Sequence, residues 1–145
     1  MRQPQRRFRR LQDGDEDRQA GRIPDAWEHL ANRDRWVRPQ DAEDDRAQLM
    51  VQCMETWCVA DHQALRTFFG QGLNERALPP LVDLEARPKD DVQAALDNAT
   101  RDCERDRAYR KGRRSFELLA ALDPAELEKH LPHFVRLCDC LRGRL

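Results

Sequence analysis

No stretch of this 145-residue sequence is apolar for long enough to span a bilayer, and its first residues lack the apolar segment of a secretory signal peptide. Hydrophobic residues make up only 39% of the chain and charged residues 37%, which favours amphipathic elements with solvated faces. The five cysteines are odd in number and lack the spacing of a secreted disulfide framework, so we expect reduced thiols. Together these absences predict a soluble, cytoplasmic, single-domain protein with no membrane partner.

The residues that catalysis requires are also scarce. Ser115 is the only serine, and it does not lie in a strand–turn–helix elbow. The pair Gly70 and Gly72 is too short for a phosphate loop, and no lysine follows it. Carboxylates are so numerous that pairs at helical spacing arise readily, and they indicate solvated, ion-paired faces. We therefore expect no enzymatic activity.

Histidine and cysteine offer few arrangements typical of a metal centre, and no CxxC pair is present. Cys58 and His62 are four residues apart and His130 and His133 are three apart, so each pair could hold one metal ion from one helix face. Cys53, however, lies on an apolar seam, where cysteine usually serves as a small buried hydrophobic residue. The sequence favours this structural role, so we expect no metal and no cofactor.

Lysine is nearly absent. It occurs only at Lys89, Lys111 and Lys129, so arginine supplies 23 of the 26 basic residues. Arginine's planar guanidinium pairs bidentately with phosphate and carboxylate and stacks on bases, which favours an anionic partner. A GC-rich genome would produce the same bias without any functional meaning.

Sustained alternation of apolar and polar residues, the mark of a strand, is missing, and helical spacing dominates. Between Asp44 and Phe69 there is neither glycine nor proline, and apolar residues recur with the period of a helix. We expect this stretch to form one long helix at the centre of the core. The sequence therefore predicts an all-α protein, a small bundle of about four to six helices.

Caps and helix breakers place the remaining elements. Residues 90–111 carry an apolar seam in steps of four and three, which predicts a second long helix. Residues 123–126 combine an Asp cap with a Pro and a Glu and are typical of a helix start, and Pro132 should kink or divide the helix that follows. Shorter helices are expected over residues 23–32 and 114–122.

Residues 1–22 carry two blocks of opposite charge and few apolar side chains. Five arginines come first, at Arg2, Arg6, Arg7, Arg9 and Arg10, and four acids follow between residues 13 and 17. Burial of so little apolar surface cannot offset the entropy lost on ordering the segment. We therefore expect a mobile, flexible basic arm over residues 1–22, followed by one helical domain over residues 23–145. The arm is either a contact for nucleic acid or an acidic partner, or a solvated tail neutralised by its own acids.

A second group of cations lies near the end of the second long helix. The apolar seam of that helix continues as Arg107, Arg110 and Arg114, so its buried face becomes cationic. This change is typical of a helix that extends beyond the core to meet an anion, but it also suits a frayed last turn whose cations complement the helix dipole. Phe8 and Tyr109 stand among the arginines of the two groups, where a base could stack.

The two groups lead to a prediction of function, a non-enzymatic helical subunit that binds the backbone of RNA or DNA within a larger assembly. The predicted contact residues are Arg6, Arg7, Arg9, Arg10, Arg107, Arg110, Lys111, Arg113 and Arg114, with Tyr109 as a stacking surface. The alternative is a protein-binding adaptor or inhibitor with no nucleic-acid contact, because apolar residues at the margin of the first long helix leave surface for a second partner. A homo-oligomer would cover the same surface.

Overall fold

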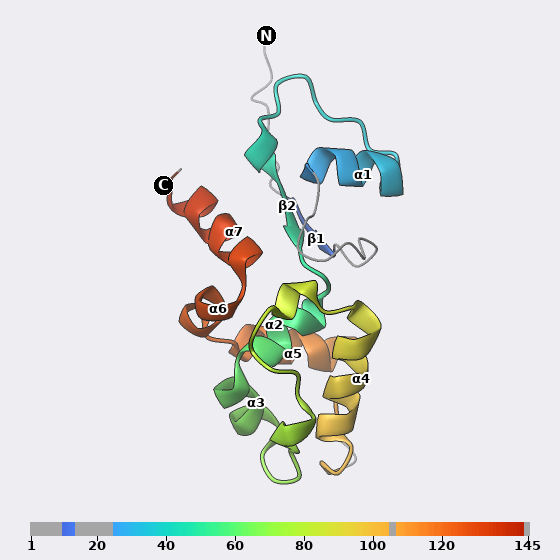
Figure 1. The fold of residues 1–145 in the computed structure, drawn as a ribbon, viewed down its shortest axis with the longest axis vertical. Helices are drawn as coiled ribbons and strands as arrows, with labels where there is room; N and C mark the ends of the chain where they lie inside the picture. Colours follow the sequence, from blue (N-terminus) through green and yellow to red (C-terminus); the bar gives the residue numbers. More distant parts are fainter. Residues whose placement is uncertain (1–9, 14–24, 105–106, 144–145) are drawn as a thin grey trace.

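The computed structural model describes residues 10–13, 25–104 and 107–143 (Figure 1). In these ranges the chain forms seven α-helices, three short 3₁₀ turns and two short strands. The elements in order are β1 (Arg10–Asp13), α1 (Ala26–Asp34), η1 (Asp44–Arg46), β2 (Ala47–Met50), α2 (Met54–Ala60), α3 (His62–Phe69), η2 (Glu75–Ala77), η3 (Leu84–Ala86), α4 (Lys89–Thr100), α5 (Arg113–Ala121), α6 (Pro124–His130) and α7 (Pro132–Arg142). The prediction of a small, mostly helical domain is confirmed.

The two strands were not predicted, and they form a small parallel sheet. Arg10 lies opposite Ala47 and Asp13 lies opposite Met50. Parallel strands require a crossover connection, and α1 lies within it, so the three elements form a βαβ unit in the upper part of Figure 1. Its apolar side chains form one cluster, called here the small cluster: Leu30, Ala47, Leu49 and Val51, with Ala26, Trp27 and Trp36 packed against them.

β1 lies within residues 1–22, the segment predicted to be a mobile arm. Only the backbone of Arg10–Asp13 is placed there, and the rest of the predicted arm lies outside the described residues. The boundary predicted at residue 23 falls just before Asp25, whose side chain accepts a hydrogen bond from the backbone N–H of Trp27 at 2.8 Å and caps α1.

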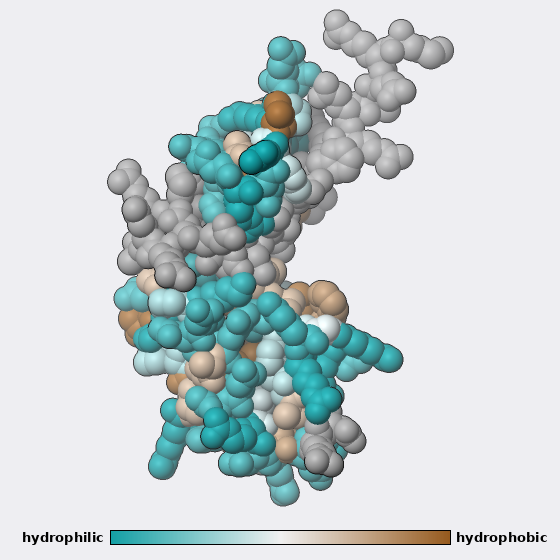
Figure 2. All heavy atoms as spheres, turned by 90° about the vertical axis from the view of Figure 1, so that its right-hand side faces the viewer, coloured by the Kyte–Doolittle hydropathy of each residue, from teal (hydrophilic) through white to brown (hydrophobic). Residues whose placement is uncertain are grey.

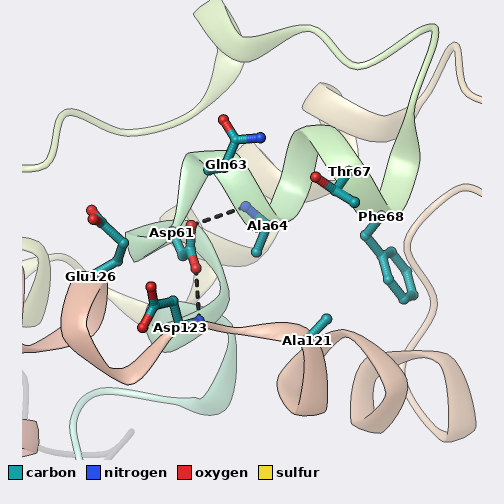
Figure 3. Close-up of a pocket in the computed structure, with 8 residues that line it drawn as sticks. All are labelled: Asp61, Gln63, Ala64, Thr67, Phe68, Ala121, Asp123 and Glu126. Atoms are coloured by element: carbon teal, nitrogen blue, oxygen red, sulfur yellow. Dashed lines mark hydrogen bonds between the residues drawn. The ribbon is translucent and has the colours of Figure 1, made fainter.

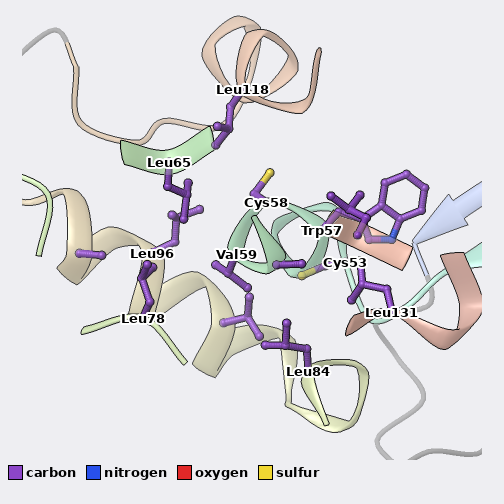
Figure 4. Close-up of a cluster of buried hydrophobic side chains, with 14 of the residues drawn as sticks. Cys53, Trp57, Cys58, Val59, Leu65, Leu78, Leu84, Leu96, Leu118 and Leu131 are labelled. Carbon is purple, nitrogen blue, oxygen red and sulfur yellow. The ribbon is translucent and has the colours of Figure 1, made fainter. Parts of the chain in front are cut away.

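The larger hydrophobic core, called here the main cluster, is organised around α2. Every residue of α2 from Glu55 to Ala60 is buried, which is typical of a helix covered on all sides. Figure 4 shows Trp57, Cys58 and Val59 surrounded by leucines of the neighbouring elements, among them Leu65, Leu84, Leu96, Leu118 and Leu131. The Trp57 ring meets the ring of Phe134 edge-to-face, with centroids 4.8 Å apart.

The prediction of one helix over Asp44–Phe69 is wrong in form, although the segment does supply the centre of the core. Its first part is the turn η1 and the buried strand β2, and its second part is divided into α2 and α3 at Asp61. A strand that is buried on both faces carries a continuous apolar run, which periodicity cannot separate from a helix. Asp61 starts α3 anew because its carboxylate accepts a hydrogen bond from the backbone N–H of Ala64 at 2.9 Å.

The predicted start and division of the last helical segment are confirmed. The carboxylate of Asp123 accepts from the backbone N–H of Ala125 at 2.9 Å, and Pro124 occupies the first turn of α6. The helix ends at His130, and Pro132 begins α7. α7 then runs upward beside β2 in Figure 1, where the Cys140 thiol donates to the backbone carbonyl of Asp45 at 3.5 Å.

The face of the described residues shown in Figure 2 is mainly hydrophilic. In the view of Figure 2, teal side chains cover most of the coloured surface, and the brown apolar areas are small and separate. No helix within residues 25–104 and 107–143 is long and apolar enough to cross a membrane.

Candidate nucleic-acid interface

The predicted contact residues fall into two groups, and the structure describes the side chains of the second group alone. Arg6, Arg7 and Arg9 lie outside the described residues, and Arg10 begins β1. The second group lies in the connection between α4 and α5 and in the first turn of α5, a helix that Figure 1 shows beside α2. We call residues 107–114 the basic loop, and they contain five cations and no acid: Arg107, Arg110, Lys111, Arg113 and Arg114.

The basic loop is not the end of a long helix. α4 ends at Thr100, so the helix predicted over residues 90–111 is wrong in its second half. The Thr100 hydroxyl donates to the carbonyl of Leu96 at 3.0 Å and accepts from the backbone N–H of Tyr109 at 3.0 Å. The second of these bonds holds Tyr109 against the last turn of α4, so the cations lie on a loop that folds back onto the end of that helix.

Tyr109 ties the basic loop to the centre of the main cluster. Its hydroxyl donates to a carboxylate oxygen of Glu55 at 2.6 Å. Glu55 belongs to α2 and is 0% exposed, and the Lys111 ammonium lies 3.8 Å from the same oxygen. A buried carboxylate requires hydrogen bonds and a nearby cation, and the basic loop supplies both.

The charge state of Glu55 follows from these contacts. Burial by itself raises the pKa of Glu55, but the hydrogen bond from Tyr109, a backbone hydrogen bond and the charge of Lys111 outweigh burial and lower it. Burial and the hydrogen bond to Glu55 raise the pKa of Tyr109 well above its ordinary value. The pair is therefore an ionised carboxylate that accepts from a neutral phenol at neutral pH.

Arg114 holds the other side of the basic loop. Its guanidinium lies over the ring of Phe68, 4.7 Å from the centroid, in a cation–π contact. The same guanidinium donates to the backbone carbonyl of Arg107, at 3.3 Å from Nε and 3.1 Å from Nη2. Arg114 is thus half-buried and engaged by the protein, whereas the other four cations of the loop are exposed.

The start of α5 concentrates positive charge, and no acid lies in its first turn. Gly112 is its N-cap, with φ of 116°, and the first turn contains Arg113 and Arg114 but no acid. The Ser115 hydroxyl bonds to Gly112, accepting from its N–H at 3.1 Å and donating to its carbonyl at 2.7 Å. Among the described residues, the first-turn amides of Arg113 and Arg114 meet no acceptor. Cations at the positive end of a helix dipole are electrostatically unfavourable, and an anion bound there would relieve the repulsion.

The exposed cations differ in how far other side chains neutralise them. Arg113 is 94% exposed and pairs with Glu117 at 3.1 Å, and Arg107 pairs with Glu104 at 3.5 Å. Such surface pairs contribute little and separate readily. Arg110 makes no hydrogen bond or ion pair with any part of the chain that the structure describes. The loop can therefore offer at least three guanidinium groups to a polyanion.

Two residues near the basic loop were missed by the sequence analysis. Glu55 was not singled out at all, because its hydrogen-bond partner Tyr109 lies 54 residues further along the chain. Phe116 was assigned to an apolar helix, yet it is 64% exposed. The structure buries Ser115 and Leu118 and turns Phe116 away from that face, which the apolar pattern of the sequence does not indicate.

The serine, two buried cysteines and His133 have structural roles. Ser115 is 1% exposed and bonded to the N-cap of α5. Burial raises the pKa of Cys53 to about 11 and raises that of Cys58 further, so both are thiols at neutral pH. Glu85 accepts from the backbone N–H of His133 at 3.0 Å and lies 2.6 Å from its Nδ1, which fixes the start of α7.

A pocket of about 540 Å³ opens between α3 and the α5–α6 connection (Figure 3). Its acids serve as caps: Asp61 accepts from the backbone N–H groups of Ala64 and Asp123, each at 2.9 Å, and is 2% exposed. Glu126 pairs with Lys129. The acidic lining does not suit a phosphate ligand. No group of three or more His, Cys, Asp or Glu side chains in the described ranges is placed to hold a metal ion.

Fold and surface together define a small, mostly helical domain with a βαβ unit at one end and a basic loop held against the main cluster. The chain belongs to the family described as a domain of unknown function, DUF4276, whose profile matches residues 2–142. No curated protein and no solved structure matches it.

Proposed function

We propose that the protein is a non-enzymatic, cytoplasmic binding subunit that contacts the phosphate backbone of a nucleic acid through the basic loop, within a larger assembly. The observation that carries the proposal is the start of α5, where Arg113 and Arg114 share the positive end of a helix that no acid caps. Oriented amides and guanidinium groups together favour phosphate more strongly than either does alone.

The contact residues divide by role. Arg107, Arg110, Lys111 and Arg113 are exposed and are assigned to phosphate oxygens. Arg114 is assigned to positioning, because its guanidinium is stacked on Phe68 and holds the carbonyl of Arg107. Tyr109 anchors the loop through Glu55. Backbone contacts of this kind give binding that depends on salt and little on sequence.

The test is a triple substitution, Arg107→Gln, Arg110→Gln and Arg113→Gln, measured by fluorescence anisotropy with a labelled oligonucleotide across a series of salt concentrations. We expect weaker binding and a salt dependence shallower by roughly 2 in log–log slope, since each phosphate contact to a single strand contributes about 0.7. The variant should unfold at the same temperature as the wild type, because these side chains are exposed.

A matched control removes three other arginines, Arg66, Arg76 and Arg142. Two of these form surface ion pairs, with Glu75 and Glu128, as Arg107 and Arg113 do. The control changes the net charge by the same amount, so it should leave the salt slope nearly unchanged if the basic loop is the site. Equal losses in both triple variants would reject the assignment.

A second candidate function is that of a protein-binding adaptor, and exposed aliphatic side chains favour it. Val37 is 89% exposed and Val82 is 68% exposed. Light scattering on a sizing column, with the ratio of absorbance at 260 and 280 nm before and after nuclease treatment, separates the two functions. Nucleic acid that co-purifies and is removed by nuclease supports the first, and a clean protein peak of the mass of an oligomer supports the second.

A further inference from the structure

Phe116 is an aromatic side chain presented to solvent beside the basic loop. It is 64% exposed, whereas Ser115 and Leu118 on the same helix are 1% and 0% exposed. It lies three residues after Arg113 on α5, so the two side chains are neighbours on one face of the helix. It does not belong to either hydrophobic cluster of the described residues.

We propose that Phe116 is a stacking platform for an unpaired base, so that the nucleic acid bound by the basic loop is single-stranded. This inference rests on the proposed function and narrows it to one class of ligand. An exposed ring next to phosphate-binding cations is the recurring arrangement of proteins that bind single strands, because every base has a face that can stack and bases of a duplex are already stacked inside it.

Phe116 takes the role that the sequence analysis gave to Tyr109. The Tyr109 ring is half-buried against the main cluster, and its hydroxyl is held by Glu55. A base could stack on Tyr109 only after the loop had released that hydrogen bond. Phe116 needs no rearrangement, since its ring already faces solvent.

The position of Phe116 on α5 also fixes where the phosphate contact and the base contact lie along the helix. Arg113 lies in the first turn, at the positive end of the helix, and Phe116 lies one turn further along the same face. Ala120, four residues after Phe116, is exposed and small, so it leaves room above the ring on that side. A strand with its phosphates at the start of α5 can therefore lay a base on Phe116.

The experiment compares a labelled 12-nucleotide single strand with the duplex of the same sequence, using the full chain and three variants at Phe116. Phe116→Ala should weaken single-strand binding by roughly 5- to 150-fold, the range for loss of one stacked base, and leave duplex binding unchanged. Phe116→Leu should lose nearly as much, because it keeps apolar area but no π-face. Phe116→Trp should bind the single strand about as tightly as the wild type does, and the fluorescence of the added tryptophan should be quenched by the single strand.

Each alternative outcome has its own signature. If the wild type binds neither oligonucleotide, the proposed function and this inference fail together. If the wild type binds but Phe116→Ala binds the single strand equally well, or loses duplex binding to the same extent, only the inference fails. If Phe116→Leu binds as tightly as the wild type, the side chain is an apolar contact and not a stacking platform. Equal thermal midpoints for all variants exclude unfolding as the cause.

Discussion

At the scale of single residues, the contact between Tyr109 and Glu55 determines where the basic loop lies. Glu55 is fully buried on α2, and the phenol of Tyr109 is its hydrogen-bond donor from the loop. Removal of that donor leaves a buried negative charge with less compensation, which costs more than a surface contact would.

We therefore expect Tyr109→Phe to lower the free energy of unfolding at neutral pH by about 1.5–3 kcal/mol, the range for a buried hydrogen bond to a charged group. Lys111→Gln is the control, because Lys111 is 59% exposed and its ammonium lies 3.8 Å from the carboxylate, so its removal should cost less than about 1 kcal/mol. Urea denaturation of both variants measures the difference. Equal losses of unfolding free energy in the two variants would contradict the prediction that the Tyr109 hydroxyl stabilises Glu55 more than the Lys111 ammonium does.

The effect of Tyr109→Phe should also depend on pH. The pKa of Glu55 in the folded chain lies below its ordinary value of 4.5, so the ionised form stabilises the fold fully above pH 4.5. That stabilisation is lost as the pH falls through the lower pKa of the folded state. Tyr109→Phe removes a hydrogen bond that lowers the pKa of Glu55, so Glu55 should take up its proton at a higher pH in the variant than in the wild type. The difference in unfolding free energy between the two proteins should therefore be largest at neutral pH and shrink as the pH falls through these two pKa values, toward the value for a neutral hydrogen bond, about 0.5–1.5 kcal/mol.

At the scale of elements, Asp61 is the joint between α2, α3 and α6. One of its oxygens accepts the N–H of Ala64 and caps α3, and the other accepts the N–H of Asp123 at the start of α6. The side chain is 2% exposed, so both bonds are made almost entirely out of contact with water.

Asp61→Ala should lower the free energy of unfolding by about 2–4 kcal/mol, since it removes a helix cap and a second charge-assisted hydrogen bond. Asp61→Asn should cost roughly half as much, because one amide oxygen can serve only one of the two N–H groups. Asp123→Ala, which removes an exposed cap, gives a reference value of about 1 kcal/mol. Thermal unfolding followed by circular dichroism ranks the three variants by stability. If Asp123→Ala is the least stable of them, Asp61 does not hold α3 and α6 together as proposed.

The elements divide into those that local sequence predicts and those that distant contacts decide. Asp123 and Pro132 placed α6 and α7 correctly, because capping and helix breaking act within a few residues. The end of α4 at Thr100 depends on the N–H of Tyr109, nine residues away, and the burial of Glu55 depends on a partner 54 residues away. Periodicity contains no information about such partners. Exposure of Phe116 was likewise not predictable, because periodicity places an apolar ring rather than the polar Ser115 on the buried face of α5.

At the scale of the whole molecule, the described chain has two hydrophobic cores of unequal size. The small cluster has four buried residues, whereas the main cluster has 18, drawn mainly from α2 and from the helices α3 to α7 packed around it. Neither the small cluster nor the pairing of Arg10 with Ala47 was predictable from sequence, because parallel pairing joins segments separated by a long crossover. The single-domain prediction could not distinguish one core from two.

The unequal cores predict unequal local stability. Amides of α1 and β2 should exchange with solvent through a partial opening of lower free energy than the opening that exposes α2 and α4, because fewer apolar contacts hold them. Native-state hydrogen exchange with mass spectrometry in low urea measures both openings. If α1 exchanges only through the same global unfolding as α4, the two clusters form one cooperative unit.

The hydrogen bond between Tyr109 and the buried Glu55 also constrains the order in which these two residues can change during evolution. A chain that first replaces Tyr109 by Phe passes through an intermediate with a buried, poorly compensated charge. A chain that first replaces Glu55 by Gln keeps a neutral hydrogen bond to the phenol, after which the loss of the hydroxyl costs little. Lineages that have abandoned the pair should therefore have lost the acid on α2 before the phenol in the loop, and a neutral residue at position 55 should accompany every loss of the hydroxyl at position 109.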